Sequence, residues 1–166
     1  MDGNVIIRNM CTEDWEAVSQ IYQQAIDAHN VTFQDFVPTY EEWDRSHLKV
    51  CRIIAEINNI VVGFVAVNSA SARACYKGVA DLSIYLDYNY HNLGLGSLLM
   101  KELIEQSEQE GFWTLQAGIF EVNKASIRLH EKFGFRIIGY REKVAKTMDG
   151  EWMNTILLER RSKIIL

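Results

Sequence analysis

Apolar positions recur along the chain with two periods, and the switch between them predicts a mixed order of strands and helices. Short runs rich in Val and Ile predict strands over residues 5–8, 50–57, 60–67, 79–86, 113–120, 135–144 and 152–158. Stripes that repeat every three or four residues predict helices between these strands. The first stripe consists of Val18, Ile21, Tyr22 and Ala25, and Thr12 can cap that helix.

Local signals predict the remaining helices and turns. Thr39 and Glu42 match a capping box, which opens a second, short helix carrying Trp43 and Leu48. Two longer helices are expected over residues 96–110 and 123–133. In the first of them, the leucines expected to face the core are Leu95, Leu98, Leu99 and Leu103. Loops or hairpin turns are expected over residues 29–38, 58–59, 70–78 and 148–150.

A turn with two glycines joins the strand predicted over 79–86 to the helix predicted over 96–110. Gly94 and Gly96 allow the backbone to approach a ligand closely. The free N–H groups and the dipole at the start of a helix suit a phosphate or pyrophosphate. The turn is not a P-loop, because no Gly-Lys-Ser/Thr follows, and Leu99 stands where a dinucleotide fingerprint has its third glycine. A connection that needs glycine only for its dihedral angles explains these residues equally well.

Composition narrows the class of protein. A chain of 166 residues suits one domain, and a net charge of −5 argues against a nucleic-acid binder. Three cysteines without a C-x-x-C spacing argue against a disulfide framework or a metal site, so Cys11, Cys51 and Cys75 are expected to be buried, reduced thiols. No apolar stretch approaches the ~18 residues of a membrane span, and Met1-Asp2-Gly3 begins no signal peptide. The expected compartment is therefore the cytoplasm.

A second motif follows the glycine turn after roughly 30 residues. Residues 123–135 (NKASIRLHEKFGF) read as an amphipathic helix, a glycine stop and a strand. The two motifs together resemble the GCN5-related N-acetyltransferase (GNAT) family. In that family a pyrophosphate loop reads Gln/Arg-x-x-Gly-x-Gly/Ala, and a later Asn-x-x-Ala/Ser helix ends in Gly-Phe or Gly-Tyr.

The resemblance extends over nearly the whole chain, roughly from Val5 to Arg160. It is closest to the phosphinothricin/methionine sulfoximine acetyltransferase branch. The segments that carry it are Ile21-Tyr22, Val31-Thr32-Phe33, Glu42-Trp43, Ser83-Ile84-Tyr85-Leu86, Leu129-His130 and Gly150-Glu151-Trp152. It implies an α/β GNAT fold, with a mixed central sheet of about seven strands flanked by about four helices. A splayed gap between two parallel strands would hold the cofactor arm.

The resemblance implies acetyl-CoA as co-substrate. Main-chain groups of Ile84, Tyr85 and Leu86 would pair with the pantetheine arm. The pyrophosphate would lie on the N–H groups of Asn92, Leu93, Gly94, Leu95, Gly96 and Ser97. The sequence departs from the family loop at His91, usually Gln or Arg, and at Leu93, often basic. Charge-assisted contacts of about 1.5–3 kcal/mol each can be missing there.

The helix that follows carries two further residues for the cofactor, Asn123 and Ser126. Asn123 lies just before its helix, where an asparagine serves well as an N-cap. The resemblance gives it a hydrogen bond to the pantetheine arm instead.

Acetyl transfer to an amine needs a neutral nucleophile, a donor for the oxyanion and a proton for the thiolate. By resemblance, Asp81 is the candidate base, acting through a water because the branch has the longer Glu there. Otherwise it is a solvated carboxylate at the start of a strand. His130 stands where many members have a Tyr general acid, and it either donates to the thiolate, positions a water or lines the tunnel. The oxyanion would be held by a backbone N–H near Leu86.

The acceptor pocket implied by the resemblance is built from the two segments 31–33 and 73–77. Arg73 or Lys77 would pair with a carboxylate or phosphinate, unless they are solvated loop cations. The predicted apolar walls are Phe33, Tyr76 and Trp152, for which core packing is the alternative. Cys75 and Asp81 complete the predicted substrate site.

The sequence thus predicts direct transfer from acetyl-CoA to the amine of a small amino-acid-like substrate, of phosphinothricin or methionine sulfoximine type. The alternatives are acetylation of a protein N-terminus or lysine, and a non-catalytic acyl-CoA sensor. The resemblance implies a homodimer. No nucleic acid, membrane or metal partner is expected.

Overall fold

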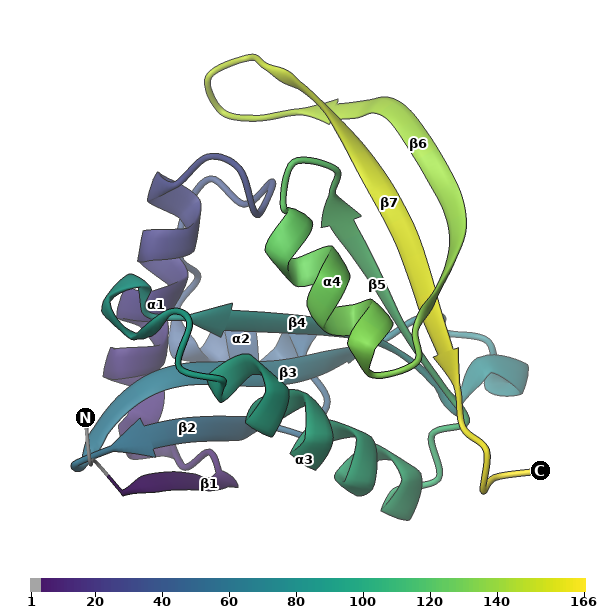
Figure 1. Cartoon of the computed structure of the whole chain (residues 1–166), viewed down its shortest axis with the longest axis horizontal. Coiled ribbons are helices and arrows are strands. Elements are labelled where there is room, and N and C mark those ends of the chain that lie inside the picture. Colours follow the sequence, from purple (N-terminus) through teal and green to yellow (C-terminus); the bar gives the residue numbers. More distant parts are fainter. Residues whose placement is uncertain (1–3) are drawn as a thin grey trace.

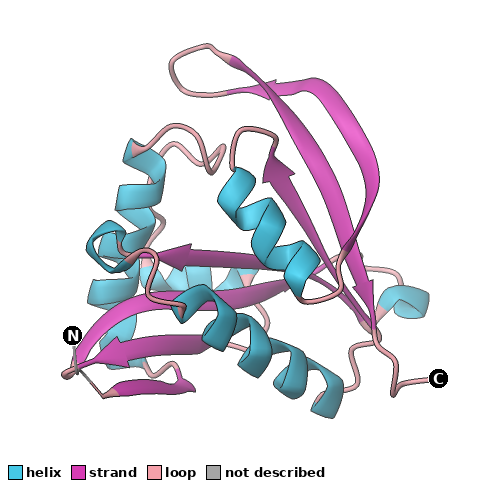
Figure 2. Ribbon diagram, in the orientation of Figure 1, coloured by secondary structure: helices cyan, strands magenta, loops and turns pink. Residues whose placement is uncertain are grey.

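Seven strands form one sheet in the order β1-β2-β3-β4-β5-β7-β6, as seen in the computed structural model, which describes residues 4–166 (Figures 1 and 2). The strands are β1 (Val5–Asn9), β2 (Ile53–Ile57), β3 (Ile60–Ser69), β4 (Val79–Leu86), β5 (Thr114–Phe120), β6 (Arg136–Lys146) and β7 (Trp152–Arg161). The α-helices are α1 (Trp15–Asp27), α2 (Tyr40–Ser46), α3 (Leu95–Gln109) and α4 (Lys124–Lys132). Short 3-10 turns cover Thr12–Asp14, Ala74–Tyr76 and Tyr88–Tyr90. The predicted α/β class and strand count are confirmed, while Met1-Asp2-Gly3 lies outside the described residues.

Alternating side chains of the central strands build two cores, one on each face of the sheet. On one face, Leu82 belongs to a large cluster with Leu99 of α3. On the other face, Ile54 and Phe64 pack with Val18 of α1. Helices α3 and α4 thus cover one face and α1 and α2 the other (Figure 1).

Strands β4 and β5 run parallel and pair only at their first residues. The pairs are Val79–Thr114, Ala80–Leu115 and Asp81–Gln116. Beyond them the strands separate, because β4 continues along β3 while β5 turns away with β7 and β6 (Figure 1). This is the splayed gap that the family resemblance implies.

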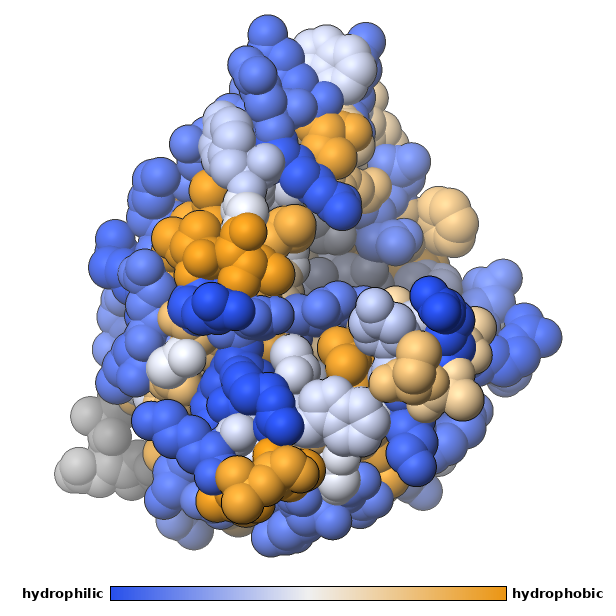
Figure 3. All heavy atoms as spheres, turned by 90° about the vertical axis from the view of Figure 1, so that its right-hand side faces the viewer, coloured by the Kyte–Doolittle hydropathy of each residue, from blue (hydrophilic) through white to orange (hydrophobic). Residues whose placement is uncertain are grey.

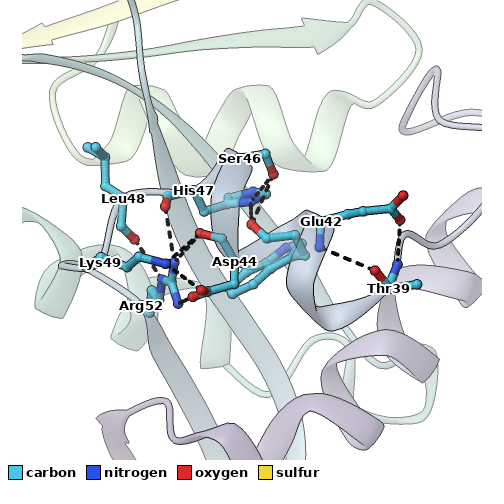
Figure 4. A network of polar contacts seen from close by, with 9 residues as sticks. Thr39, Glu42, Asp44, Ser46, His47, Leu48, Lys49 and Arg52 are labelled. Atoms are coloured by element: carbon cyan, nitrogen blue, oxygen red, sulfur yellow. Dashed lines mark hydrogen bonds and ion pairs between the residues drawn. The ribbon is translucent and has the colours of Figure 1, made fainter.

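A network of polar contacts fixes α2 and the segment after it (Figure 4). The backbone N–H of Thr39 donates to the Glu42 carboxylate at 2.9 Å, and the Thr39 hydroxyl accepts from the Glu42 N–H. The predicted capping box is therefore confirmed. The Arg52 guanidinium donates to the Asp44 carboxylate at 2.6 Å and to the Leu48 carbonyl at 2.7 Å.

Three expectations about the helices were wrong. Helix α2 ends at Ser46, so it carries Trp43 but not Leu48. Leu98 is 41% exposed, because it lies about 100° around α3 from Leu99, which faces the sheet. Helix α1 begins at Trp15, since residues 12–14 form a 3-10 turn. The carboxylate of Asp14 accepts the Cys11 N–H at 2.8 Å and so fixes this turn.

The thiols also differ from expectation. Only Cys51 is buried, and its burial raises the pKa of its thiol to about 12. Cys11 and Cys75 are exposed. Cys51 has a φ of 59°, outside the strand region, which explains why β2 begins two residues later than this position rather than at the predicted residue 50.

The β6–β7 hairpin extends beyond the helices, and β6 forms the outer edge of the sheet (Figures 1 and 2). Apolar side chains gather on the face that Figure 3 shows. The exposed apolar residues of β6 are Ile137, Ile138, Tyr140 and Val144.

Candidate active site

A cavity of about 500 Å³ opens where β4 and β5 separate. Its walls come from β4, β5, the start of α3, α4, and the end of α1 with the segment after it. Ligand sites in proteins commonly measure roughly 300–1,000 Å³. The lining begins on β4 at Leu82 and on β5 at Ala117, directly after the last strand pair. The divergence of the two strands therefore creates the cavity.

Most residues predicted to bind the cofactor line this cavity, together with one of the two predicted catalytic residues. They are Ile84, Tyr85, Leu86, Asn92, Gly94, Leu95, Gly96, Ser97, Asn123, Ser126 and His130. The other predicted site residues lie outside its lining: Phe33, Arg73, Cys75, Tyr76, Lys77, Asp81 and Leu93. The roles of both groups stay predictions.

One end of the cavity presents backbone donors. Within the described residues, no acceptor meets the N–H groups of Asn92, Gly94, Leu95 and Gly96. Gly94 has a φ of 78°, a left-handed conformation that glycine adopts without strain. The N–H of Ser97, also predicted as a donor, already donates to the Gly94 carbonyl at 3.1 Å. Unpaired N–H groups at the start of a helix have the geometry and the dipole that suit an anion.

A lysine that no sequence motif selects stands beside these N–H groups. The Lys132 ammonium at the end of α4 donates to the Ser97 hydroxyl at 2.9 Å. The two residues lie 35 positions apart, so only the packing of α4 near α3 brings them together. His91 turns back instead, with its Nε2 3.2 Å from the Leu86 carbonyl. Lys132 thus places a cation beside the glycine turn, whereas His91 and Leu93, at the positions where family members are often basic, do not.

Asn123 serves as an N-cap and keeps an unpaired donor at the cavity. Its side-chain oxygen accepts the Ser126 N–H at 3.2 Å, which confirms the N-cap. The amide nitrogen of Asn123 has no partner among residues 4–166, and the residue lines the cavity. Its N–H₂ group is therefore free to donate to a bound ligand.

His130 brings a buried acceptor to the cavity wall. Only 2% of the residue is exposed, and its Nδ1 lies 2.7 Å from the Ser126 carbonyl. Because a carbonyl only accepts, Nδ1 carries the proton and Nε2 of the neutral ring carries the lone pair. Among the described residues, this Nε2 is the one buried side-chain nitrogen or oxygen without a partner. Burial lowers the pKa of His130, which favours the neutral ring near pH 7.

The candidate base Asp81 lies where the gap begins. It is half-buried, and its Oδ1 accepts a hydrogen bond of 2.7 Å from the side-chain amide of Gln116. Ser83, two residues further along the same face of β4, lines the cavity. Asp81 therefore stands next to the cavity. The sequence reasoning missed Gln116, since nothing in the sequence predicts this register.

The predicted acceptor residues are spread over several elements. Phe33 packs on Phe120 at the end of β5, with ring centroids 4.4 Å apart. Residues 73–77 form an exposed 3-10 turn before β4. Trp152 is 53% exposed, and the Lys146 ammonium lies 4.7 Å from its ring centroid. The structure does not bring these side chains together around the cavity.

Known proteins match this fold and its two motifs. Residues 15–135 match the model of the acetyltransferase (GNAT) family. The chain is 30% identical to phosphinothricin N-acetyltransferase of Streptomyces viridochromogenes over 139 residues, which cover 81% of this chain and 76% of that protein. It is also 30% identical to L-amino acid N-acetyltransferase AaaT of Escherichia coli over 167 residues, or 95% and 98% of the two chains.

A crystal structure of ribosomal-protein-alanine N-acetyltransferase from Brucella melitensis has a TM-score of 0.87 at 26% identity, covering 95% of this chain and 99% of that one. The chain belongs to the GNAT acetyltransferase family, as its glycine turn and its later helix predicted. No helix within residues 4–166 is long and apolar enough to cross a membrane.

The hydrogen bond from Nδ1 predicts one tautomer for His130. We expect ¹⁵N NMR of the imidazole rings, assigned with a His130→Gln variant, to show His130 protonated at Nδ1 alone at pH 7. It should gain its second proton only below the usual pKa of about 6.5, because burial disfavours the charged ring. A ring protonated at Nε2 at pH 7 would contradict this assignment.

Proposed function

We propose that this chain is a cytoplasmic, acetyl-CoA-dependent N-acetyltransferase that acts on the amine of small amino-acid-like substrates. The observation that carries the proposal is the cavity between β4 and β5. It has backbone donors at the start of α3 and a buried acceptor on His130. The chain belongs to the GNAT acetyltransferase family, and both features suit the binding of acetyl-CoA.

The cavity suits an acyl-CoA in two respects. The N–H groups of Gly94, Leu95 and Gly96, with Lys132 beside them, match the charge of a pyrophosphate. The backbone of β4 beyond Asp81 has no strand partner on the β5 side, so an extended amide chain can pair there as an added strand. A Cβ at Gly96 would lie 3.1 Å from the Leu129 side chain, which indicates how closely α3 and α4 approach here.

Acetyl-CoA supplies a thioester, whose carbonyl carbon the acceptor amine attacks. The reaction forms a C–N bond and breaks a C–S bond. The acceptor ammonium must lose a proton before attack, and Asp81, through a water, is our candidate acceptor of that proton. The nitrogen loses a second proton as the amide forms, and the departing thiolate takes up a proton through water, so that CoA leaves as the thiol. The neutral His130 accepts a hydrogen bond at Nε2, and so orients a water or an N–H group in the cavity. A general-acid role for His130 is disfavoured, because Nδ1 donates to the Ser126 carbonyl and Nε2 has no proton to give.

The substrate class rests on the relatives, whose names specify phosphinothricin and L-amino acids. Among the described residues that line the cavity, none is Lys or Arg. By the family resemblance, Arg73 and Lys77 are our candidates for the substrate's acidic group, although both lie outside the cavity lining on the exposed turn before β4. The Brucella structure, named for a protein substrate, supports the second candidate, acetylation of a protein N-terminus.

An amine panel tests the proposed function. We expect release of free CoA from acetyl-CoA with phosphinothricin, methionine sulfoximine or methionine sulfone, and little with peptides that begin with alanine. Asp81→Asn should lower kcat by about 100-fold or more, as expected for loss of a positioned base. Transfer to peptides alone would favour the second candidate. Binding of acetyl-CoA without transfer to any amine would favour the acyl-CoA sensor.

The role of Lys132 predicts a change in cofactor affinity. We expect Lys132→Met to raise KM for acetyl-CoA about three- to tenfold and to leave kcat nearly unchanged, because an exposed ammonium adds a modest, screened attraction to phosphate. The difference should shrink as salt is added. Lys49→Met, on the opposite face of the sheet, serves as control. An unchanged KM for acetyl-CoA in Lys132→Met at low salt would refute the proposed attraction between Lys132 and the pyrophosphate.

We also propose that two copies associate through β6. Among residues 4–166 the outer edge of this strand has no strand partner, and it carries exposed apolar side chains. We expect light scattering to give the mass of a dimer, and Ile137→Lys to give that of a monomer, because a charge would be buried at the interface. Leu98→Lys, at a similarly exposed leucine of α3, should remain a dimer. A monomeric wild type would contradict this proposal.

A further inference from the structure

Gln116 and Asp81 form a side-chain pair at the vertex of the gap. They are the last of three register pairs between β4 and β5, and the cavity lining begins at the next residue of each strand. The side-chain amide of Gln116 donates to Oδ1 of Asp81 at 2.7 Å. Both residues are half-buried, so this bond is partly shielded from water.

The hydrogen bond from Gln116 makes the two carboxylate oxygens of Asp81 unequal. Oδ1 is occupied by Gln116, whereas Oδ2 has no partner among the described residues. An aspartate has two soft side-chain torsions, and a single hydrogen bond to one oxygen fixes the direction of the other. The length of the glutamine lets β5 reach the carboxylate from the neighbouring strand without any backbone distortion at these positions.

The two strands do not need this bond for their pairing. Backbone pairing already joins them at Val79, Ala80 and Asp81, and β5 is further held by seven pairs to β7. The side-chain bond therefore has an effect that the backbone register does not supply, which is the orientation of the Asp81 carboxylate.

We infer that Gln116 is a positioning residue, which holds Oδ1 of Asp81 so that Oδ2 receives the proton of the acceptor amine through a water. This inference rests on the proposed function, in which Asp81 is the base. Gln116 contacts neither substrate nor cofactor in this account, and it acts only through Asp81. The shorter Asp depends on such a fixed direction, because its reach to the amine includes a water.

A double-mutant cycle separates this role from packing. We expect Gln116→Met to lower kcat on the order of tenfold, because small displacements of a catalytic group are costly. The KM for acetyl-CoA should not change. In an Asp81→Asn background the same substitution should lower kcat less than twofold, since the residue it acts through is already lost. A loss of equal size in both backgrounds would overturn the inference.

A second variant keeps the test decisive where Asp81→Asn has no measurable activity. Gln116→Leu also has no N–H to donate, but its side chain differs in shape from that of Gln116→Met. Both Gln116→Leu and Gln116→Met should therefore lose activity, whereas a packing role would spare Gln116→Met, whose side chain has nearly the length and volume of glutamine. Thr114→Val, two residues earlier on the same face of β5, is the matched control and should keep wild-type kcat and thermal stability.

The outcomes distinguish the two proposals. If wild-type protein transfers no acetyl group to any amine, the proposed function fails. If wild-type protein is active and both Gln116 variants keep its kcat, the inference alone fails. A drop in kcat for both variants, with thermal stability and the acetyl-CoA KM unchanged, supports it.

Discussion

The short parallel pairing between β4 and β5 is the constraint on which the rest of the site depends. Three residue pairs hold the strands together, and after Asp81 and Gln116 each strand follows a different antiparallel neighbour. The sheet therefore splits, while β4 stays paired with β3 and β5 stays paired with β7. The split opens the cavity, leaves one side of the β4 backbone unpaired, and brings α3 and α4 to its two walls.

The polar groups around this cavity form two sets, one exposed to solvent and one buried. At the exposed end, the backbone N–H groups of α3 and the ammonium of Lys132 provide a diffuse positive field for phosphate. In the interior, the partner of Nδ1 fixes the proton of His130, and Nε2 is left as an acceptor. Removing water strengthens such interior contacts, so their geometry matters more than that of the exposed ones. This division agrees with a ligand bound through its phosphates outside and reacting inside.

Sequence patterns predicted the elements well, because period-two and period-3.6 runs report directly which face is buried. They also predicted the residues of the glycine turn and of the α4 face, since each motif is local. They failed at Leu98, which lies at the edge of the stripe formed by the buried Leu95, Leu99 and Leu103 and is exposed. They could not find Lys132 or Gln116, whose partners lie 35 residues away and depend on how the strands are registered and the helices packed. The acceptor residues 73–77 matched a family segment, yet the fold leaves them exposed outside the cavity.

We propose that unpaired backbone groups of β4 and of the start of α3 receive acetyl-CoA. Hydrogen–deuterium exchange with and without acetyl-CoA is the measurement of choice, since it reads single stretches of backbone. We expect acetyl-CoA to slow exchange in peptides covering residues 82–86 and 92–96, while the β2–β3 hairpin keeps its exchange rate. Protection confined to other segments, or none at saturating acetyl-CoA, would contradict it.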